Sequence, residues 1–179
     1  QVIKTDGSGT LSFASPLTYA TAHTFDNTRN EKTFTGIPST AKRITMMIQD
    51  LSSASNGSGQ VGIRVGTSTG LNTSAIYRYN VGYDAVGESN TISTYWSLVQ
   101  SGWTNSIYAF DGVFQLVKLG TTGNKWVFSS LIAMPNGGDV NYSAGSIDLG
   151  SDVLDRIQLL HAAGSINYNQ GTVNIMYES

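Results

Sequence analysis

Residues 34–50, FTGIPSTAKRITMMIQD, form the stretch of sequence that decides the fold class. The stretch opens with a turn that contains a glycine and a proline, and it continues through a basic pair. Residues 44–48 are then the most apolar segment in the first third of the chain. Because side chains alternate along a β-strand, a strand here places Ile44, Met46 and Ile48 on one face.

The same stretch also fits an amphipathic helix. At helical spacing, one stripe would contain Ile44, Met47, Ile48 and Leu51. Ser39 could then serve as the N-cap of the helix. Periodicity alone leaves both interpretations open, but the composition of the neighbouring segments favours a strand.

The composition of the whole chain is typical of a β protein with an uncharged surface. Hydrophobic residues make up 40% of the 179 residues and charged residues only 12%, about half the usual share of ~25%. Ser, Thr, Asn and Gly must therefore cover the surface, and these residues suit strands and turns better than helices. The net charge of −2 gives no general attraction for nucleic acid or for an anionic membrane.

The length suits one domain preceded by a short arm. We assign residues 1–20 to an N-terminal arm or linker and residues 21–179 to the folded domain. The Asp6-Gly7 pair is also a hairpin signal, which is the alternative reading of the arm. The chain begins with Gln rather than Met, which suggests a segment of a longer or processed chain, although the choice of numbering explains it equally well. There is no cysteine, and no apolar run is long enough to span a bilayer.

Frequent glycines divide the chain into pieces of strand length, several of which alternate cleanly. In residues 60–67, Val61, Ile63 and Val65 share one face. Residues 171–179 repeat the pattern with an apolar set of Val173, Ile175 and Tyr177. Residues 110–119 and 125–133 are apolar on both faces, which predicts a hairpin of central strands buried between two sheets.

One segment resists assignment by periodicity. Residues 151–163, SDVLDRIQLLHAA, have apolar residues at helical spacing and a helix cap at Ser151 or Asp152. The many short strands elsewhere nevertheless predict an all-β fold. We expect an antiparallel β-sandwich of the jelly-roll type.

The sequence contains few residues suited to catalysis or to metal binding. His23 and His161 are the only histidines, and neither lies in a metal-binding or nucleophile motif. The carboxylates are scattered and mostly lie beside turns, where aspartate commonly bonds the backbone. We therefore predict a protein that is not an enzyme, with no cofactor and no metal site.

Two sets of residues are candidates for binding or for fixing strand register. Exposed aromatic rings among Asn, Ser and Gly can stack on sugars or form protein interfaces. The candidates in glycine-bounded loops are Tyr77, Tyr79, Tyr83 and Trp103. The alternative is that single rings of this set belong to the core. Separately, Arg156 could pair with Glu178 across neighbouring strands, or Asp155 with residues 42–43, and either pair would fix register rather than add stability.

Two motifs of this chain resemble a β-rich module near the C-termini of tail-fibre and other virion proteins of tailed bacteriophages. The first is residues 34–45, FTGIPSTAKRIT, followed by a turn rich in Asn, Ser and Gly. The second comprises residues 154–156, LDR, and the closing residues 171–178, GTVNIMYE. The resemblance covers about a third of the chain and is weak over residues 71–119. It implies strands at residues 43–48 and 153–160, and it supplies no catalytic residues.

The resemblance implies a virion protein that is made in the bacterial cytoplasm. Its partners would be identical subunits, as a homotrimer, and other virion proteins, with no nucleic acid and no membrane insertion. One expected role is a tail-fibre or spike module that binds a glycan or protein on the host surface. The alternative is a capsid decoration protein whose N-terminal arm reaches a neighbouring subunit. A third class, the carbohydrate-binding module of a secreted enzyme, requires a catalytic domain upstream.

Overall fold

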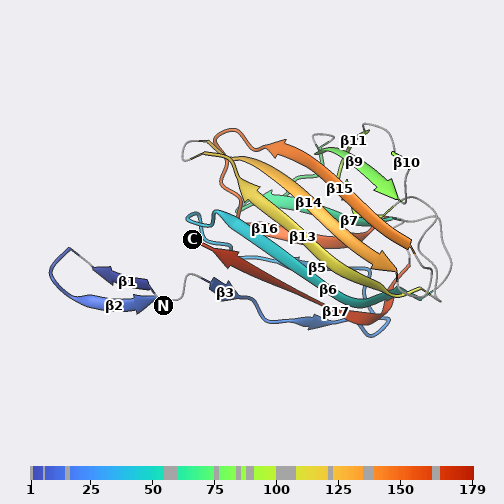
Figure 1. Ribbon diagram of the computed structural model, residues 1–179, viewed down its shortest axis with the longest axis horizontal. Helices are drawn as coiled ribbons and strands as arrows, with labels where there is room; N and C mark the ends of the chain where they lie inside the picture. Colours follow the sequence, from blue (N-terminus) through green and yellow to red (C-terminus); the bar gives the residue numbers. More distant parts are fainter. Residues whose placement is uncertain are drawn as a thin grey trace.

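The computed structural model describes most of the chain. The described residues are 2–5, 7–14, 17–54, 60–74, 77–83, 86–87, 91–99, 108–120, 123–134, 139–162 and 166–179. Over these residues the chain forms antiparallel strands and no helix. Two sheets pack against each other as a sandwich (Figure 1), so the predicted all-β sandwich is confirmed.

Over the described residues, the larger sheet has ten strands and forms one layer of the sandwich. Eight of them follow one another across the sheet. In that order they are β10 (Val86–Gly87), β9 (Tyr77–Tyr83), β15 (Asp139–Asp148), β14 (Lys125–Met134), β13 (Phe110–Lys118), β6 (Arg43–Ser53), β17 (Tyr168–Glu178) and β3 (Leu17–Tyr19). Two short strands complete it, β11 (Thr91–Ser93) beside β9 and β4 (His23–Thr24) beside β17.

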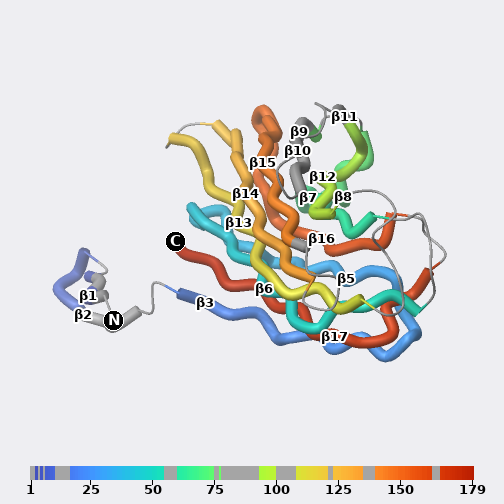
Figure 2. Tube along the Cα trace, turned by 45° about the vertical axis from the view of Figure 1, so that its right-hand side comes forward, coloured from blue at the N-terminus to red at the C-terminus, as the bar shows by residue number. Residues whose placement is uncertain are grey.

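The smaller sheet covers one face of the larger one. Its order is β12 (Trp96–Ser97), β7 (Val61–Thr67), β16 (Arg156–His161) and β5 (Glu31–Phe34), and β8 (Gly70–Leu71) pairs with β7. Figure 2 shows the strands of both sheets in a view turned by 45° from that of Figure 1. These strand orders establish a sandwich of antiparallel sheets, whereas the jelly-roll connectivity stays a prediction.

The N-terminal segment forms a hairpin that stands apart from the sandwich. Strands β1 (Val2–Thr5) and β2 (Leu11–Ala14) pair only with each other among the described residues. Both views place this hairpin to one side of the sandwich (Figures 1 and 2). The segment assigned to an arm thus contains the hairpin, but it also contains β3, which already belongs to the large sheet.

Both segments whose helix or strand assignment was open are strands. In β6, Ile44, Met46 and Ile48 are buried at 0, 0 and 5% exposure, as expected for one face of a strand. In residues 151–163, β16 begins at Arg156 and pairs with β7 on one side and β5 on the other. Neighbours on both sides satisfy the backbone of β16, so pairing outweighs its helical spacing.

The core between the sheets is built around an aromatic cluster. The indole of Trp96 on β12 lies 4.6 Å from the ring of Phe128 and 5.8 Å from the ring of Phe114. Tyr77 on β9 meets the same indole edge to face at 5.0 Å. All but Phe128 are completely buried, and Phe128 is 4% exposed. This cluster joins three strands of the large sheet to the smaller sheet.

The prediction that β13 and β14 are buried on both faces is wrong. Phe114 and Leu116 point into the core, but Val113 on the other face is 40% exposed. On β14, Ile132 is buried, whereas the neighbouring Leu131 is 55% exposed. The smaller sheet covers only one face of the large sheet, so apolar residues on the opposite face remain open. We call this uncovered surface of β17, β6, β13, β14 and β15 the outer face.

Candidate functional site

Tyr77 is a core residue, which corrects its selection as a surface ligand candidate. Its ring is fully buried. Its hydroxyl accepts from the Val65 amide at 3.0 Å, and its single proton is shared between the carbonyl oxygens of Asn72 and Val65, at 2.8 and 3.0 Å. Burial raises the pKa of Tyr77 to about 12. The ring therefore joins β9 to β7 and is not available to a ligand.

The other aromatic candidates stay predictions. Tyr79 and Tyr83 lie on β9, where their backbones pair with Gly145 and Asn141 of β15. Their side chains, and the whole of Trp103, lie outside the described residues. The structure therefore brings the backbones of these two tyrosines onto one strand, and their role in recognition is still to be tested.

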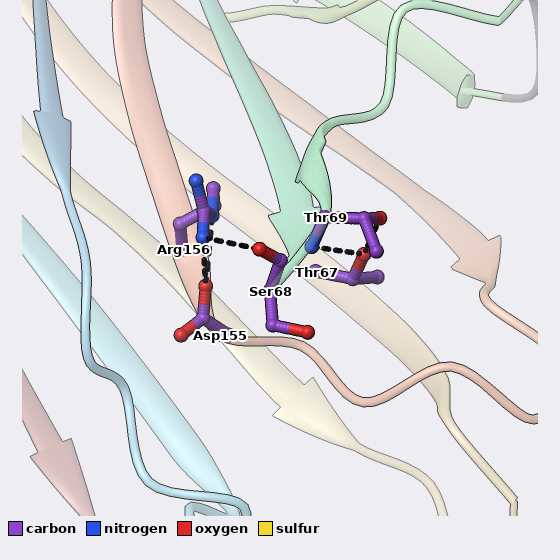
Figure 3. Close-up of polar contacts among 5 residues, drawn as sticks. All are labelled: Thr67, Ser68, Thr69, Asp155 and Arg156. Carbon is purple, nitrogen blue, oxygen red and sulfur yellow. Dashed lines mark hydrogen bonds and ion pairs between the residues drawn. The ribbon is translucent and has the colours of Figure 1, made fainter.

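The predicted register pair between Arg156 and Glu178 is wrong. Arg156 starts β16 in the smaller sheet, whereas Glu178 ends β17 in the larger one. The guanidinium of Arg156 instead lies 2.7 Å from the carboxylate of Asp155 and donates to the Ser68 carbonyl at 3.1 Å (Figure 3). Arg156 thus fixes the turn between β7 and β8 rather than the register of the large sheet.

The carboxylate of Glu178 pairs with Arg43, which is its directly opposite neighbour on β6. Arg43 Nη1 donates to Glu178 Oε1 at 3.2 Å, and both side chains are partly exposed. An exposed pair of this kind contributes only ~0–1 kcal/mol. This Arg43–Glu178 pair was not predicted from the sequence.

His161 is packed inside the sandwich. It is 1% exposed, and its ring meets the ring of Tyr168 at 5.7 Å. Neither ring nitrogen has a hydrogen-bond partner among the described residues. Burial therefore favours the neutral imidazole and lowers the pKa of His161 below its ordinary value. His23 on β4 is less buried, and its pKa is also lowered, first by burial and then by Lys32 and Arg29.

We expect the buried His161 to make the fold sensitive to mild acid. Unfolding exposes the imidazole, so the unfolded chain binds the extra proton more readily once the pH falls below ~6.5. The free energy of unfolding should therefore decrease from pH 7 to pH 5, by at most about 1.4 kcal/mol per pH unit from this group. Urea unfolding of His161→Phe at several pH values should show a flatter profile. The matched variant His23→Phe should keep most of the slope, and an unchanged slope in His161→Phe would contradict this account.

A pocket lies where three strands of the large sheet end or begin at one end of the sandwich. Arg43 at the start of β6 pairs with Val117 near the end of β13 and with Glu178 at the end of β17. Backbone hydrogen bonds extend the pairing of these three segments beyond the strand ends. The Lys42 amide donates to the Glu178 carbonyl at 2.7 Å, and the Lys118 amide donates to the Lys42 carbonyl at 2.9 Å. We call the resulting open hollow, of about 760 Å³, the strand-end pocket.

The strand-end pocket is cationic and surrounded by hydroxyl groups. Its lining residues are Ser39, Thr40, Ala41, Lys42, Arg43, Val117, Lys118, Gly120, Glu178 and Ser179. Three of the lining side chains are cationic and one is acidic, so the side chains alone carry an excess of two positive charges, in a chain whose net charge is −2. Glu178 is paired with Arg43, so Lys42 and Lys118 are the cationic lining residues without an ion pair in the described part of the chain. Lys118 Nζ lies 6.0 Å above the ring of Trp126.

A second, polar hollow lies at the same end of the sandwich. It has a volume of about 350 Å³. Its lining residues are Thr67, Thr69, Gly70, Leu71, Asn72, Thr73, Ser74, Asp148, Leu149 and Asp152. Several of its polar groups already bind nearby backbone: Asp148 accepts from the Gly150 amide at 2.9 Å, and Asn72 accepts from the Ser74 amide at 2.9 Å. These groups stabilise turns, so the strand-end pocket is the stronger candidate.

Several other kinds of site are not seen in the part of the chain that the structure describes. Over these residues, no three His, Asp or Glu side chains lie close enough together to hold a metal ion. The same part of the chain contains no helix of the length and apolar character needed to cross a membrane.

Comparison with known proteins adds no relative. No protein-family model matches the chain, and neither the curated proteins nor the solved structures contain a match. The functional argument therefore depends on the geometry of the strand-end pocket and on the two sequence motifs.

Sequence reasoning missed the strand-end pocket, although it noted one part of it. Lys42 and Arg43 were visible as a basic pair before an apolar strand, and Glu178 was considered as an ion-pair partner. Lys118 gave no signal of its own, because only the pairing of β13 with β6 brings it beside Lys42.

Proposed function

We propose that this chain is a non-enzymatic module of a tailed-bacteriophage virion, located on a tail fibre or spike, that binds the host surface through the strand-end pocket. The observation that carries the proposal is the pocket itself, in which two lysines and several hydroxyl groups share an open hollow of about 760 Å³. This volume lies within the ~300–1,000 Å³ usual for small-ligand sites. The two motifs that resemble fibre modules support the virion assignment.

The chemistry of the pocket favours an anionic saccharide as the ligand. An ammonium group attracts a carboxylate or phosphate, and hydroxyl groups such as those of Ser39 and Thr40 can exchange hydrogen bonds with sugar hydroxyls. The Thr40 hydroxyl donates to the Ser179 hydroxyl at 3.1 Å, and backbone hydrogen bonds between the strand ends fix the chain around this pair. Attraction between exposed charges is screened at high ionic strength, so binding through this pocket should weaken as salt is added.

A capsid decoration protein is the second candidate, and one observation favours it. The hairpin of β1 and β2 stands apart from the sandwich (Figure 1), as an arm that holds a neighbouring subunit would. In either role the chain works with other virion proteins and with copies of itself. The homotrimer expected from the resemblance remains a prediction.

Two binding measurements separate the candidates. A fibre module should bind host cells saturably, and soluble sugar from the cell surface should compete with it. A decoration protein should bind empty capsids and raise their resistance to heat, and it should not bind the host cells. Binding to capsids without binding to cells would contradict the fibre role. Hydrolysis of a host-surface polysaccharide by the purified chain would contradict the non-enzymatic assignment.

A further inference from the structure

The outer face carries a row of apolar side chains in direct cross-strand register. Val113 on β13 pairs with Met47 on β6 on one side and with Leu131 on β14 on the other, and Leu131 pairs with Tyr142 on β15. Side chains directly opposite on neighbouring strands lie ~4.5–5.5 Å apart at Cβ. Met47, Val113, Leu131 and Tyr142 therefore form one continuous stripe across four strands, which we call the apolar row.

The apolar row is open to solvent. Val113, Leu131 and Tyr142 are 40, 55 and 48% exposed, and Val140, two residues from Tyr142 on the same face, is 43% exposed. Four of the eight exposed large hydrophobic residues in the described part of the chain thus gather on these adjacent strands. Scattered exposed apolar residues are ordinary, but a contiguous group marks an interaction surface.

The surroundings of the apolar row are almost uncharged. The next row toward the strand-end pocket consists of Thr45, Gln115, Ser129 and Ala144. On the other side, Asp111 pairs with Ala133, which pairs with Val140. Asp111 is the one charged residue among these seven positions, and its carboxylate accepts from the Asp50 amide at 2.8 Å. A polyanion or an anionic headgroup finds no cation here.

We propose that a second copy of this chain packs on the outer face, with the apolar row at the centre of the contact. Five strands from β17 to β15, over seven residues each, span about 24 by 24 Å at strand spacings of ~4.8 Å and rises of ~3.4 Å per residue. Each copy then buries roughly 600 Å², and the roughly 1,200 Å² in total lies at the lower end of stable, specific interfaces. A sheet face of this kind packs against another sheet at ~10 Å, and the same face of another copy offers an apolar, uncharged counterpart.

The mass of the 179-residue chain in solution tests this surface. Sedimentation of the wild-type chain over a range of concentrations should give a species of twice the 19.1 kDa monomer, because a contact between the same face of two copies closes as a dimer. Leu131→Lys and Tyr142→Lys should each shift this species to the monomer, because a buried ammonium in the contact is strongly unfavourable. Both residues are half exposed in the single chain, so both variants should fold and give the wild-type circular dichroism spectrum.

Two matched variants make the result specific to the outer face. Val153→Lys adds the same charge at an apolar residue that is 43% exposed but lies outside the large sheet, and it should associate like the wild type. Ile3→Lys adds the charge to the separate hairpin, at a residue 60% exposed. A wild-type monomer at all concentrations would overturn the proposal. Association that persists in both Leu131→Lys and Tyr142→Lys would also overturn it. The same holds if only Ile3→Lys abolishes association.

Discussion

Replacing Trp96 with alanine is expected to lower the free energy of unfolding by about 3–5 kcal/mol, the usual cost of removing a buried aromatic ring. The indole is fully buried and contacts the rings of Tyr77, Phe114 and Phe128. Removing it leaves a cavity between the two sheets, because strands on both sides hold the neighbouring rings in place. Urea unfolding followed by circular dichroism measures the loss.

Two variants serve as references for the Trp96 result. Trp96→Phe keeps an aromatic ring in the cluster. Trp96 Nε1 has no hydrogen-bond partner among the described residues, so this variant should cost clearly less than Trp96→Ala. Tyr19→Ala removes an aromatic ring that is 59% exposed at the edge strand β3. Its effect should stay within about 0.5 kcal/mol. A Trp96→Ala protein as stable as Tyr19→Ala would show that the aromatic cluster is not the centre of the core.

Replacing Gly171 with alanine is expected to cost about 3–5 kcal/mol, from backbone strain combined with a steric clash. Gly171 has φ +109°, which L residues rarely adopt, and it lies where the pairing of β17 with β6 shifts register. A Cβ atom here would lie 2.5 Å from Leu51 Cα and 2.8 Å from the Asp50 carbonyl oxygen. Backbone atoms of a central strand cannot move aside cheaply, so the two strands must separate locally.

Gly36→Ala separates the two causes. Gly36 also has a positive φ, of +76°, but a Cβ atom there would meet nothing within 4 Å. This variant should therefore show the strain alone, about 1–2 kcal/mol, in the same unfolding measurement. Equal losses in the two alanine variants would contradict the steric clash at Gly171.

The alternation of strands could be predicted from the sequence because it is a local property. Val61, Ile63 and Val65 on β7 are all buried, as are Val173 and Ile175 on β17. Each of these sets follows from the period of two along a strand. The low charge of the chain also favoured an all-β fold, because a surface of Ser, Thr, Asn and Gly suits strands and turns better than solvated helices.

Which face of each strand is buried depends on contacts between segments distant in the sequence, so it could not be predicted. Leu131 looked like a core residue because both faces of its strand are apolar, yet the smaller sheet covers only the opposite face. Tyr77 looked like a surface ring, yet its hydroxyl bonds the backbone of Val65 on a strand of the other sheet. Glycines were expected to end strands, but Gly171 lies inside β17.

The candidate site was unpredictable for the same reason. The strand-end pocket combines residues near positions 40, 118 and 178, and only the pairing of β6 with β13 and β17 brings them together. No spacing of residues along the sequence indicates such a site. The aromatic candidates, by contrast, followed from composition, and of these the structure describes only the side chain of Tyr77.

The measurement that tests the proposed function most directly is binding to an array of acidic and neutral bacterial surface glycans. The wild-type chain should bind acidic glycans, with affinity that falls as salt is added. A Lys42→Ala/Lys118→Ala variant should lose this binding at least tenfold, corresponding to about 1.4 kcal/mol. Lys125→Ala, an exposed lysine of β14 that does not line the pocket, should bind like the wild type. Undiminished binding by the double variant, or no glycan bound at all, would contradict recognition through the strand-end pocket.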